Sequence, residues 1–183
     1  GDLIISIIAG MPSRVLARGL GVAKVVRAMP NTPAQIGQGM TVWTATPAVD
    51  ETGLRQAQAI LGALGKELYV SDEGDLDRAT ALSGTGPSYI FLFMEALIDA
   101  GVHLGFSRRV AQELVYQTLE GSLAIARETG VHPVELRNRV TSPGGTTAEA
   151  LYQLEKGGLR TVMSKAIWAA YQRSVSLGEL ADE

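Results

Sequence analysis

The first 71 residues alternate short apolar runs with stretches of helical period. Residues 3–8 form a continuous, β-branched-rich run, which is typical of a strand buried on both faces of a parallel sheet. Further strands are expected over residues 23–28, 40–45 and 67–71, and helices over residues 13–18 and 50–64. Strands that alternate with helices predict an α/β layer whose strands are at least partly parallel.

From residue 74 onward the apolar positions repeat with the period of helices. Helices are expected over residues 75–82, 87–101, 107–130, 133–140, 146–156 and 159–177, with a break at residues 83–88 and a disordered acidic tail at residues 179–183. The change of period predicts an α/β domain over residues 1–73 and an all-α domain over residues 74–183. The helix at 87–101 is apolar on nearly every face, so another subunit is expected to cover part of it.

The composition narrows the possible functions. The chain has 183 residues, a net charge of −3, no cysteine and two histidines, so neither a nucleic-acid footprint nor a metal site is expected. The apolar runs at residues 3–9 and 89–102 are shorter than the roughly 20 residues that cross a bilayer. A soluble, cytoplasmic protein without a membrane partner is therefore expected.

Two strand ends are candidates for ligand binding, because ligands of such sheets lie at the carboxyl ends of the strands. The first is Ala9-Gly10, and the second is the stretch 29–33, in which two prolines bracket Asn31 and Thr32. The second stretch has an alternative interpretation as an ordinary proline-rich connection. None of the glycine-rich turns has the complete spacing of a dinucleotide fingerprint. We therefore expect the chain to begin with a strand from the middle of a sheet.

Residues 141–147 combine hydroxyl side chains, a proline and two glycines before a helical pattern. Thr146 and Glu149 fit the capping box, which predicts Thr146 at the N-cap. The free N–H groups of the first turn would suit a carboxylate or a phosphate. The alternative interpretation is a well-capped helix with no ligand.

Taken together, several motifs resemble those of the pyrroline-5-carboxylate reductase family, in the family's order and over essentially the whole chain. They are Met29-Pro30-Asn31-Thr32-Pro33, Leu82-Ser83-Gly84-Thr85-Gly86-Pro87-Ser88-Tyr89, residues 132–147 and Glu155-Lys156-Gly157-Gly158. The resemblance implies the second half of a Rossmann-type parallel sheet followed by a helical domain that forms a homodimer. Further assembly of such dimers into a decamer is known in the family that the chain resembles. It also implies hydride transfer from NADPH or NADH to the imine of 1-pyrroline-5-carboxylate, a cyclic imino acid, which gives L-proline.

The resemblance also implies roles for individual residues. Thr147 corresponds to the catalytic hydroxyl beside the ring nitrogen. The substrate loop corresponds to Ser142, Gly144, Gly145, Thr146 and Thr147. The nicotinamide half of the cofactor is expected beside Ile7, Ile8, Ala9, Gly10, Met29, Pro30, Asn31 and Pro87.

Without a glycine-rich fingerprint, this chain alone is expected to be inactive and to bind NADPH weakly, and calorimetry would test this. Two alternatives stay open at this stage. One is a helical assembly module without chemistry. The other is a related hydroxy-acid dehydrogenase, which the absence of a lysine from the stretch 142–147 counts against.

Overall fold

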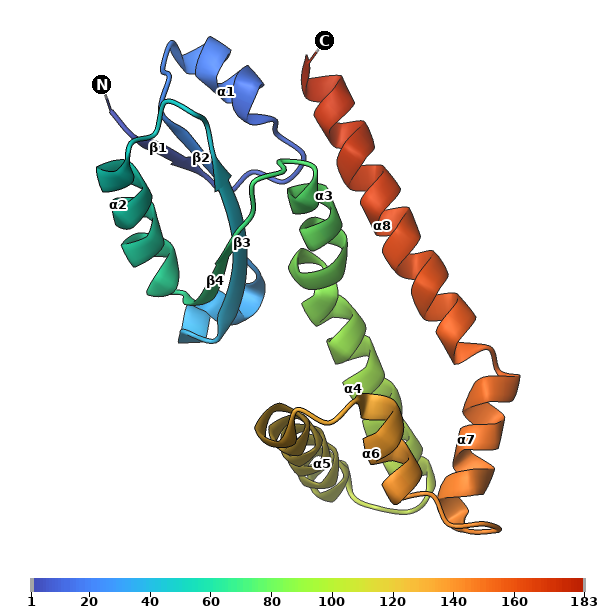
Figure 1. Ribbon diagram of the computed structural model, residues 1–183. Coiled ribbons are helices and arrows are strands. Elements are labelled where there is room, and N and C mark those ends of the chain that lie inside the picture. Colours follow the sequence, from blue (N-terminus) through green and yellow to red (C-terminus); the bar gives the residue numbers. More distant parts are fainter. Residues whose placement is uncertain (1, 183) are drawn as a thin grey trace. The chain divides into compact units, whose positions relative to one another are not determined.

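A mixed four-stranded sheet forms the first part of the chain in the computed structural model, which describes residues 2–182 (Figure 1). The strands are β1 (Ile4–Ser6), β2 (Val25–Met29), β3 (Gly39–Ala45) and β4 (Gly65–Tyr69), and they lie in that order. β1 and β2 pair in parallel, β2 and β3 antiparallel, and β3 and β4 in parallel. The α/β class is confirmed, but the sheet is mixed rather than wholly parallel.

The connections explain this mixed pattern. Helices α1 (Ser13–Leu20) and α2 (Glu51–Gly62) lie in the two connections that join parallel strands. The connection between β2 and β3 contains only the short 3₁₀ helix η1 (Thr32–Ile36), which is too little chain for a crossover. The chain therefore reverses direction at the prolines, and β3 runs antiparallel to β2.

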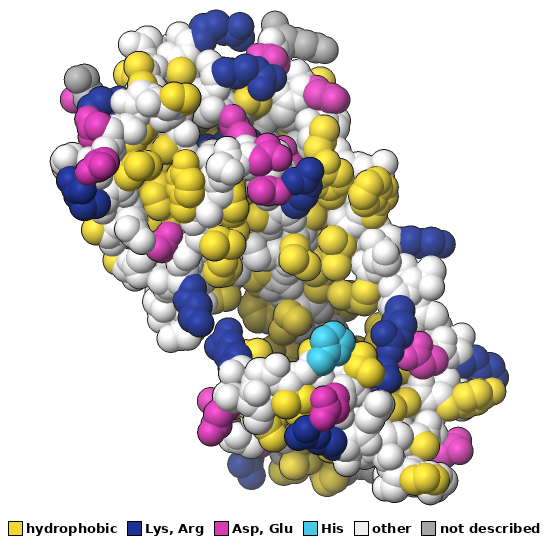
Figure 2. Space-filling model, viewed as in Figure 1, with side chains coloured by type: hydrophobic (Ala, Val, Ile, Leu, Met, Phe, Trp, Pro, Cys, Tyr) yellow, Lys and Arg dark blue, Asp and Glu magenta, His cyan; other side chains and the backbone are white. Residues whose placement is uncertain are grey.

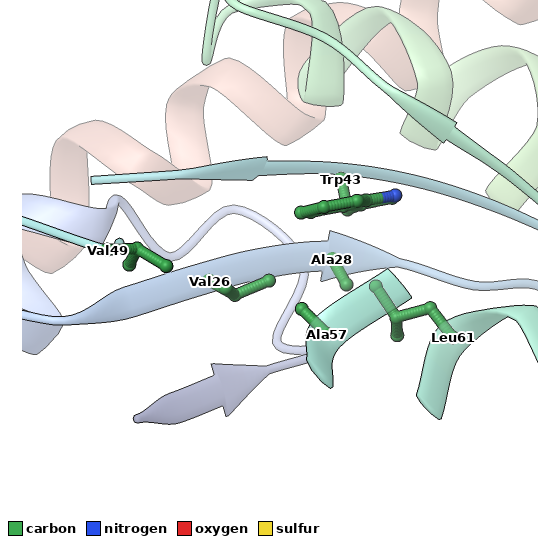
Figure 3. Packing of buried hydrophobic residues seen from close by; sticks show 6 residues of the cluster. All are labelled: Val26, Ala28, Trp43, Val49, Ala57 and Leu61. Atoms are coloured by element: carbon green, nitrogen blue, oxygen red, sulfur yellow. The ribbon is translucent and has the colours of Figure 1, made fainter. Parts of the chain in front are cut away.

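The hydrophobic core of this part lies between the sheet and α2. Val26 and Ala28 of β2, Trp43 of β3 and Leu61 of α2 are at most 3% exposed and pack together (Figure 3). Asp50 caps α2, because its carboxylate accepts the Gly53 N–H at 2.8 Å.

The first strand is less buried than expected. β1 ends at Ser6, and the side chains of Ile7 and Ile8 are 60% and 53% exposed. The prediction of a strand buried on both faces is wrong for the described residues, because β1 is an edge strand that pairs only with β2.

Helices make up the remainder of the chain. They are α3 (Asp75–Ala79), the π-helical turn η2 (Thr80–Gly84), α4 (Gly86–His103), α5 (Arg108–Thr129), α6 (Pro133–Arg139), α7 (Thr146–Lys156) and α8 (Leu159–Asp182). α5 begins after the Ser107 cap and ends at Gly130, as predicted. The predicted break at residues 83–88 is instead a π turn within one helical run, and the predicted disordered tail continues α8 to Asp182, while Glu183 lies outside the described residues.

The chain divides into two compact units. The sheet unit comprises the described residues up to Tyr89 together with those from Ser164 onward, and the helical unit is Ile90–Met163. The predicted domain boundary at residues 73 and 74 stays a prediction.

One helical run is long and apolar enough to cross a membrane by length and composition alone. It is Asp75–His103, with 29 residues, and 11% of its most apolar window is buried. The core helices of soluble proteins pass the same test. The expectation of no membrane partner therefore stays a prediction, since the run at 89–102 belongs to a longer helix than the sequence suggested.

Candidate functional site at a strand edge and a helix start

A tight turn shapes the loop before α7. The Gly145 N–H donates to the Ser142 carbonyl at 3.1 Å, with Pro143 and Gly144 between them. Proline at the second position and a glycine with a φ of +67° at the third are the requirements of a type II turn. The Thr141 hydroxyl donates to the Arg137 carbonyl at 2.7 Å, which fixes the loop to the end of α6.

The N-cap lies one residue earlier than predicted, although α7 covers the predicted residues, Thr146–Lys156. Gly145, with φ −84° and ψ 170°, is the N-cap of α7, and no side chain caps it. Its carbonyl accepts the N–H groups of Ala148 and Glu149 at 3.1 and 3.3 Å. The predicted capping box of Thr146 with Glu149 is wrong, because Thr146 already lies in the first helical turn.

This shift leaves several polar groups available for a ligand. Within residues 2–182, the hydroxyls of Ser142, Thr146 and Thr147 have no hydrogen-bond partner, and neither do the backbone N–H groups of Gly144, Thr146 and Thr147. Thr147 is half-buried, whereas Ser142 and Thr146 are exposed. Hydroxyl and N–H donors at the positive end of an 11-residue helix suit a carboxylate.

The strand-end candidates lie in the sheet unit. Because β1 and β2 are parallel, their carboxyl ends share one edge of the sheet. Ile7, Ile8 and Ala9 are exposed at this edge. Gly10 is buried against α8, where a Cβ added to it would lie 2.6 Å from the Leu177 Cβ.

The second strand end contacts the π turn. Met29, Pro30 and Asn31 are half-buried, and the Asn31 amide donates to the Ser83 carbonyl at 3.1 Å. Pro87 is half-buried in the first turn of α4. The structure thus joins the stretch 29–31 to the turn that precedes Pro87, whereas the loop 142–147 belongs to the other compact unit.

A buried polar cluster on the sheet was not recognised in the sequence. Arg27 of β2, with a 4% exposed side chain, forms ion pairs with Glu73 and Asp77, each at 3.1 Å. The N–H and hydroxyl of Ser13 donate to Glu73 at 2.6 and 2.7 Å, and the Ser174 hydroxyl donates to Asp77 at 2.8 Å. The sequence does contain one signal for this cluster, because an arginine stands inside the otherwise apolar run of β2.

The cluster changes the acidity of Glu73. Burial on its own raises the pKa of Glu73, but hydrogen bonds from Ser13 and Arg27 outweigh burial and hold that pKa below its ordinary value. Glu73 is therefore a carboxylate that stabilises the fold.

Two other kinds of site, a cavity and a metal centre, are also possible places for the chemistry. A cavity of about 630 Å³ lies between η2 and α8, and its lining residues include none of the predicted site residues. Among residues 2–182, no group of three or more His, Cys, Asp or Glu side chains is arranged to hold a metal ion. The candidate chemistry therefore rests on the strand edge and on the loop before α7.

The fold defines a class of protein in which a mixed α/β layer is joined to a helical domain. A family model described as pyrroline-5-carboxylate reductase dimerisation matches residues 73–177. The chain belongs to the pyrroline-5-carboxylate reductase family. This confirms the resemblance and gives no support to the assembly-module or hydroxy-acid dehydrogenase alternatives.

Individual relatives agree with this assignment. The chain is 43% identical to pyrroline-5-carboxylate reductase of Synechocystis over 177 residues and 44% identical to that of Pseudomonas aeruginosa over 179 residues, each covering 97% of this chain. It spans 66% of the length of each of these two relatives. A crystal structure of the Plasmodium falciparum reductase with NADP bound matches with a TM-score of 0.93 and 37% identity, over 97% of this chain and 70% of that one.

Proposed function

We propose that the protein containing this chain reduces the imine of 1-pyrroline-5-carboxylate to L-proline with a hydride from NAD(P)H. The observation that supports this most directly is the set of unpaired donors at the start of α7, described above. The proposal also draws on the relatives, which are named for this reaction.

The loop before α7 would orient the substrate. Its free N–H groups, those of Gly144, Thr146 and Thr147, suit the substrate carboxylate and would fix which ring face meets the cofactor. The Thr147 hydroxyl would donate a hydrogen bond to the ring nitrogen, which makes the imine carbon more electrophilic. A threonine hydroxyl is too weak an acid to protonate that nitrogen, so the proton would come from water or from the substrate itself.

The strand edge fits the nicotinamide half of the cofactor. Ile7, Ile8 and Ala9 offer exposed apolar surface there, beside the half-buried Met29 and Pro30. NAD(P)H, when bound, supplies the hydride. These side chains would exclude water from one side of the reacting groups and hold them in position. The side chains that would distinguish NADPH from NADH are not among the residues predicted to bind the cofactor.

A homodimer formed through the helical unit is part of the proposal, and a decamer is its further extension. Large hydrophobic side chains of α4 and α5 are exposed, among them Phe91 at 59% and Leu123 at 52%. The family model that matches this region is described as a dimerisation domain. A soluble enzyme in the cytoplasm stays the expected setting.

The Thr147→Ala variant tests the proposed function. We would measure it in a full-length chimera, in which the amino-terminal segment of the Pseudomonas aeruginosa relative precedes this chain. Removal of one donor that acts in the transition state costs on the order of a hundredfold in kcat/KM. Thr161→Ala is the matched control, because Thr161 is exposed on α8 and its hydroxyl makes no hydrogen bond within residues 2–182.

The assay follows NADPH oxidation with 1-pyrroline-5-carboxylate, alongside thermal unfolding of each variant. A fall in kcat/KM for Thr147→Ala without a matching loss of stability would support the assignment. Unchanged turnover would refute the role of Thr147, and a parent chimera without imine reductase activity would refute the proposed function.

A further inference from the structure

The backbone carbonyl of Ser83 lacks its normal helical partner. In an α-helix this carbonyl would accept the N–H of the residue four positions later, which is Pro87 and has no N–H to donate. The next N–H along the chain, that of Ser88, donates to the Thr85 carbonyl at 3.0 Å. Ser83 is half-buried, so its carbonyl needs a donor from elsewhere.

Asn31 supplies that donor from the end of β2. Its Nδ2 donates to the Ser83 carbonyl at 3.1 Å, and its Oδ1 accepts the Met40 N–H at 2.9 Å. A carbonyl can only accept and an N–H can only donate, so the two partners fix the orientation of the amide. Both ends of the Asn31 side chain are therefore engaged within the protein.

The turn that Asn31 contacts is itself held by its own bonds. The N–H and the hydroxyl of Thr85 donate to the Thr80 carbonyl at 2.8 and 2.9 Å, which closes the π turn. The Tyr89 hydroxyl donates to the Ala81 carbonyl at 3.2 Å. The contact with β2 is thus made to a turn of defined shape.

A second contact lies beside the first. A Cβ added at Gly84 would lie 2.7 Å from the Met29 Cε, so the Met29 side chain passes directly over this glycine. Met29 and Asn31 on one side, and Ser83 and Gly84 on the other, form two adjacent links between the strand end and the turn. We call these two links the strand–turn clasp.

We propose that Asn31 is a positioning residue, which uses the carbonyl freed by Pro87 to hold the end of β2 against the start of α4. This inference rests on the proposed function, because the strand end and Pro87 are the expected neighbours of the nicotinamide. Asn31 then acts through the clasp rather than as a ligand of the cofactor. Its loss displaces the surface against which the reacting ring lies.

The test uses Asn31→Ala and Asn31→Asp in the full-length chimera, with Gln38→Ala as control. The aspartate keeps an acceptor for Met40 but loses the donor to Ser83, so both Asn31 variants are expected to behave alike. Displacement of a reacting group by about 1 Å can lower turnover on the order of a hundredfold. Gln38 is an exposed amide in the same connection, with no side-chain hydrogen bond within residues 2–182.

We expect kcat to fall at least tenfold in both Asn31 variants, while the KM for NADPH changes less than about threefold, since remote contacts dominate cofactor affinity. The deuterium isotope effect with 4-deuterated NADPH should rise as hydride transfer becomes rate-limiting. A kcat within twofold of the parent would overturn the inference but leave the proposed function intact. A large rise in KM with unchanged kcat would also overturn it, by making Asn31 a direct ligand.

Pro87→Ala provides a second test of the strand–turn clasp, which stays informative even if Asn31→Ala folds poorly. This variant gives position 87 an N–H for the Ser83 carbonyl, so the Asn31 bond becomes dispensable. Asn31→Ala should therefore lower the unfolding midpoint and kcat less in the Pro87→Ala background than in the parent. Additive effects would overturn the clasp, and a parent chimera with no imine reductase activity would overturn both proposals.

Discussion

The sheet unit and the helical unit differ in how much apolar surface they bury. The sheet unit has a core in which Val26 is 0%, Trp43 3% and Leu61 1% exposed. In the helical unit, the buried hydrophobic residues of the described chain are Ile98 and Ala111. Figure 2 shows hydrophobic side chains at the surface of the molecule on the face drawn.

This difference indicates that the two units acquire their stability differently. Burial of apolar surface contributes about 25 cal/mol per Å², so the sheet unit can be stable by its own packing. A helical unit with two buried hydrophobic residues needs a further surface to cover its helices. The sheet unit should therefore unfold independently of protein concentration, and the helical unit should not.

The largest effect is expected for Leu92→Asp. Leu92 lies on α4 and is 66% exposed in the single chain. If a second copy covers it, the carboxylate would be buried without a partner, which raises the dimer dissociation constant roughly a thousandfold. Sedimentation velocity measures this directly.

Leu20→Asp is the matched control, since Leu20 ends α1 in the sheet unit and is 57% exposed. It should leave the sedimentation coefficient unchanged. A parent protein that sediments as a monomer, or a Leu92→Asp variant that stays dimeric, would remove the proposed difference between the two units.

The next largest effect is expected for Leu61→Ala in the core of the sheet unit. Leu61 is 1% exposed, and its truncation leaves a cavity that costs about 2–5 kcal/mol of unfolding free energy. Ile60→Ala, one position away and 56% exposed, should cost far less. Urea unfolding at two protein concentrations would measure both, and equal effects would contradict a core confined to one face of α2.

A smaller effect is expected from the buried carboxylate of Glu73. Because its pKa is lowered in the folded protein, Glu73 stabilises the fold above its unfolded pKa of about 4.3, and this contribution is lost as the pH falls through the lower folded pKa. The unfolding free energy of the parent should therefore drop more steeply with acid than that of Glu73→Gln.

The measurement is the urea midpoint between pH 6 and about pH 3. Glu179→Gln is the control, because Glu179 is exposed in the sheet unit and its side chain has no hydrogen-bond partner within residues 2–182. Identical slopes for parent and Glu73→Gln would show that the cluster around Arg27 does not stabilise the charged carboxylate.

The smallest effect is expected at a helix cap. The Ser107 hydroxyl accepts the Val110 N–H at 3.4 Å at the start of α5. Ser107→Ala should cost about 1 kcal/mol, whereas Ser107→Thr keeps the acceptor and should cost less. Thermal unfolding should show this loss most clearly at low protein concentration, and a loss independent of concentration would weaken the distinction between the units.

Local signals predicted the helices well. Ser107 and Gly130 marked the ends of α5, and His132-Pro133 marked the start of α6, because caps and stops depend on neighbouring residues. The presence of a loop before α7 was also predicted from its own residues. The roles of its individual residues stay predictions, since they depend on a ligand.

Features that depend on contacts between residues distant in the sequence were not predicted. A break was predicted at residues 83–88, but the structure has a π turn there, and its Ser83 carbonyl accepts a hydrogen bond from Asn31, which is far away in the sequence. Arg27 pairs with Glu73, just before α3, and with Asp77 on α3. These carboxylates accept hydrogen bonds from α1 and α8, and no local pattern relates these elements. The burial of β1 was overestimated, because an apolar run shows that a strand has hydrophobic side chains to bury. It does not show how many other strands pair with it.

The π turn η2 also sets the rotational phase of α4. A π turn holds one residue more than an α turn in about the same rotation, so each residue after it is offset by about 100° from its place on an α-helical wheel of 3.6 residues per turn. The side chains after Gly86 therefore point in directions that no continuous α-helical wheel drawn from Asp75 would give. Because the π turn accommodates one residue more than an α turn, deleting a single residue within Thr80–Gly84 should convert it to an α turn and leave the apolar surface of α4 in its present orientation.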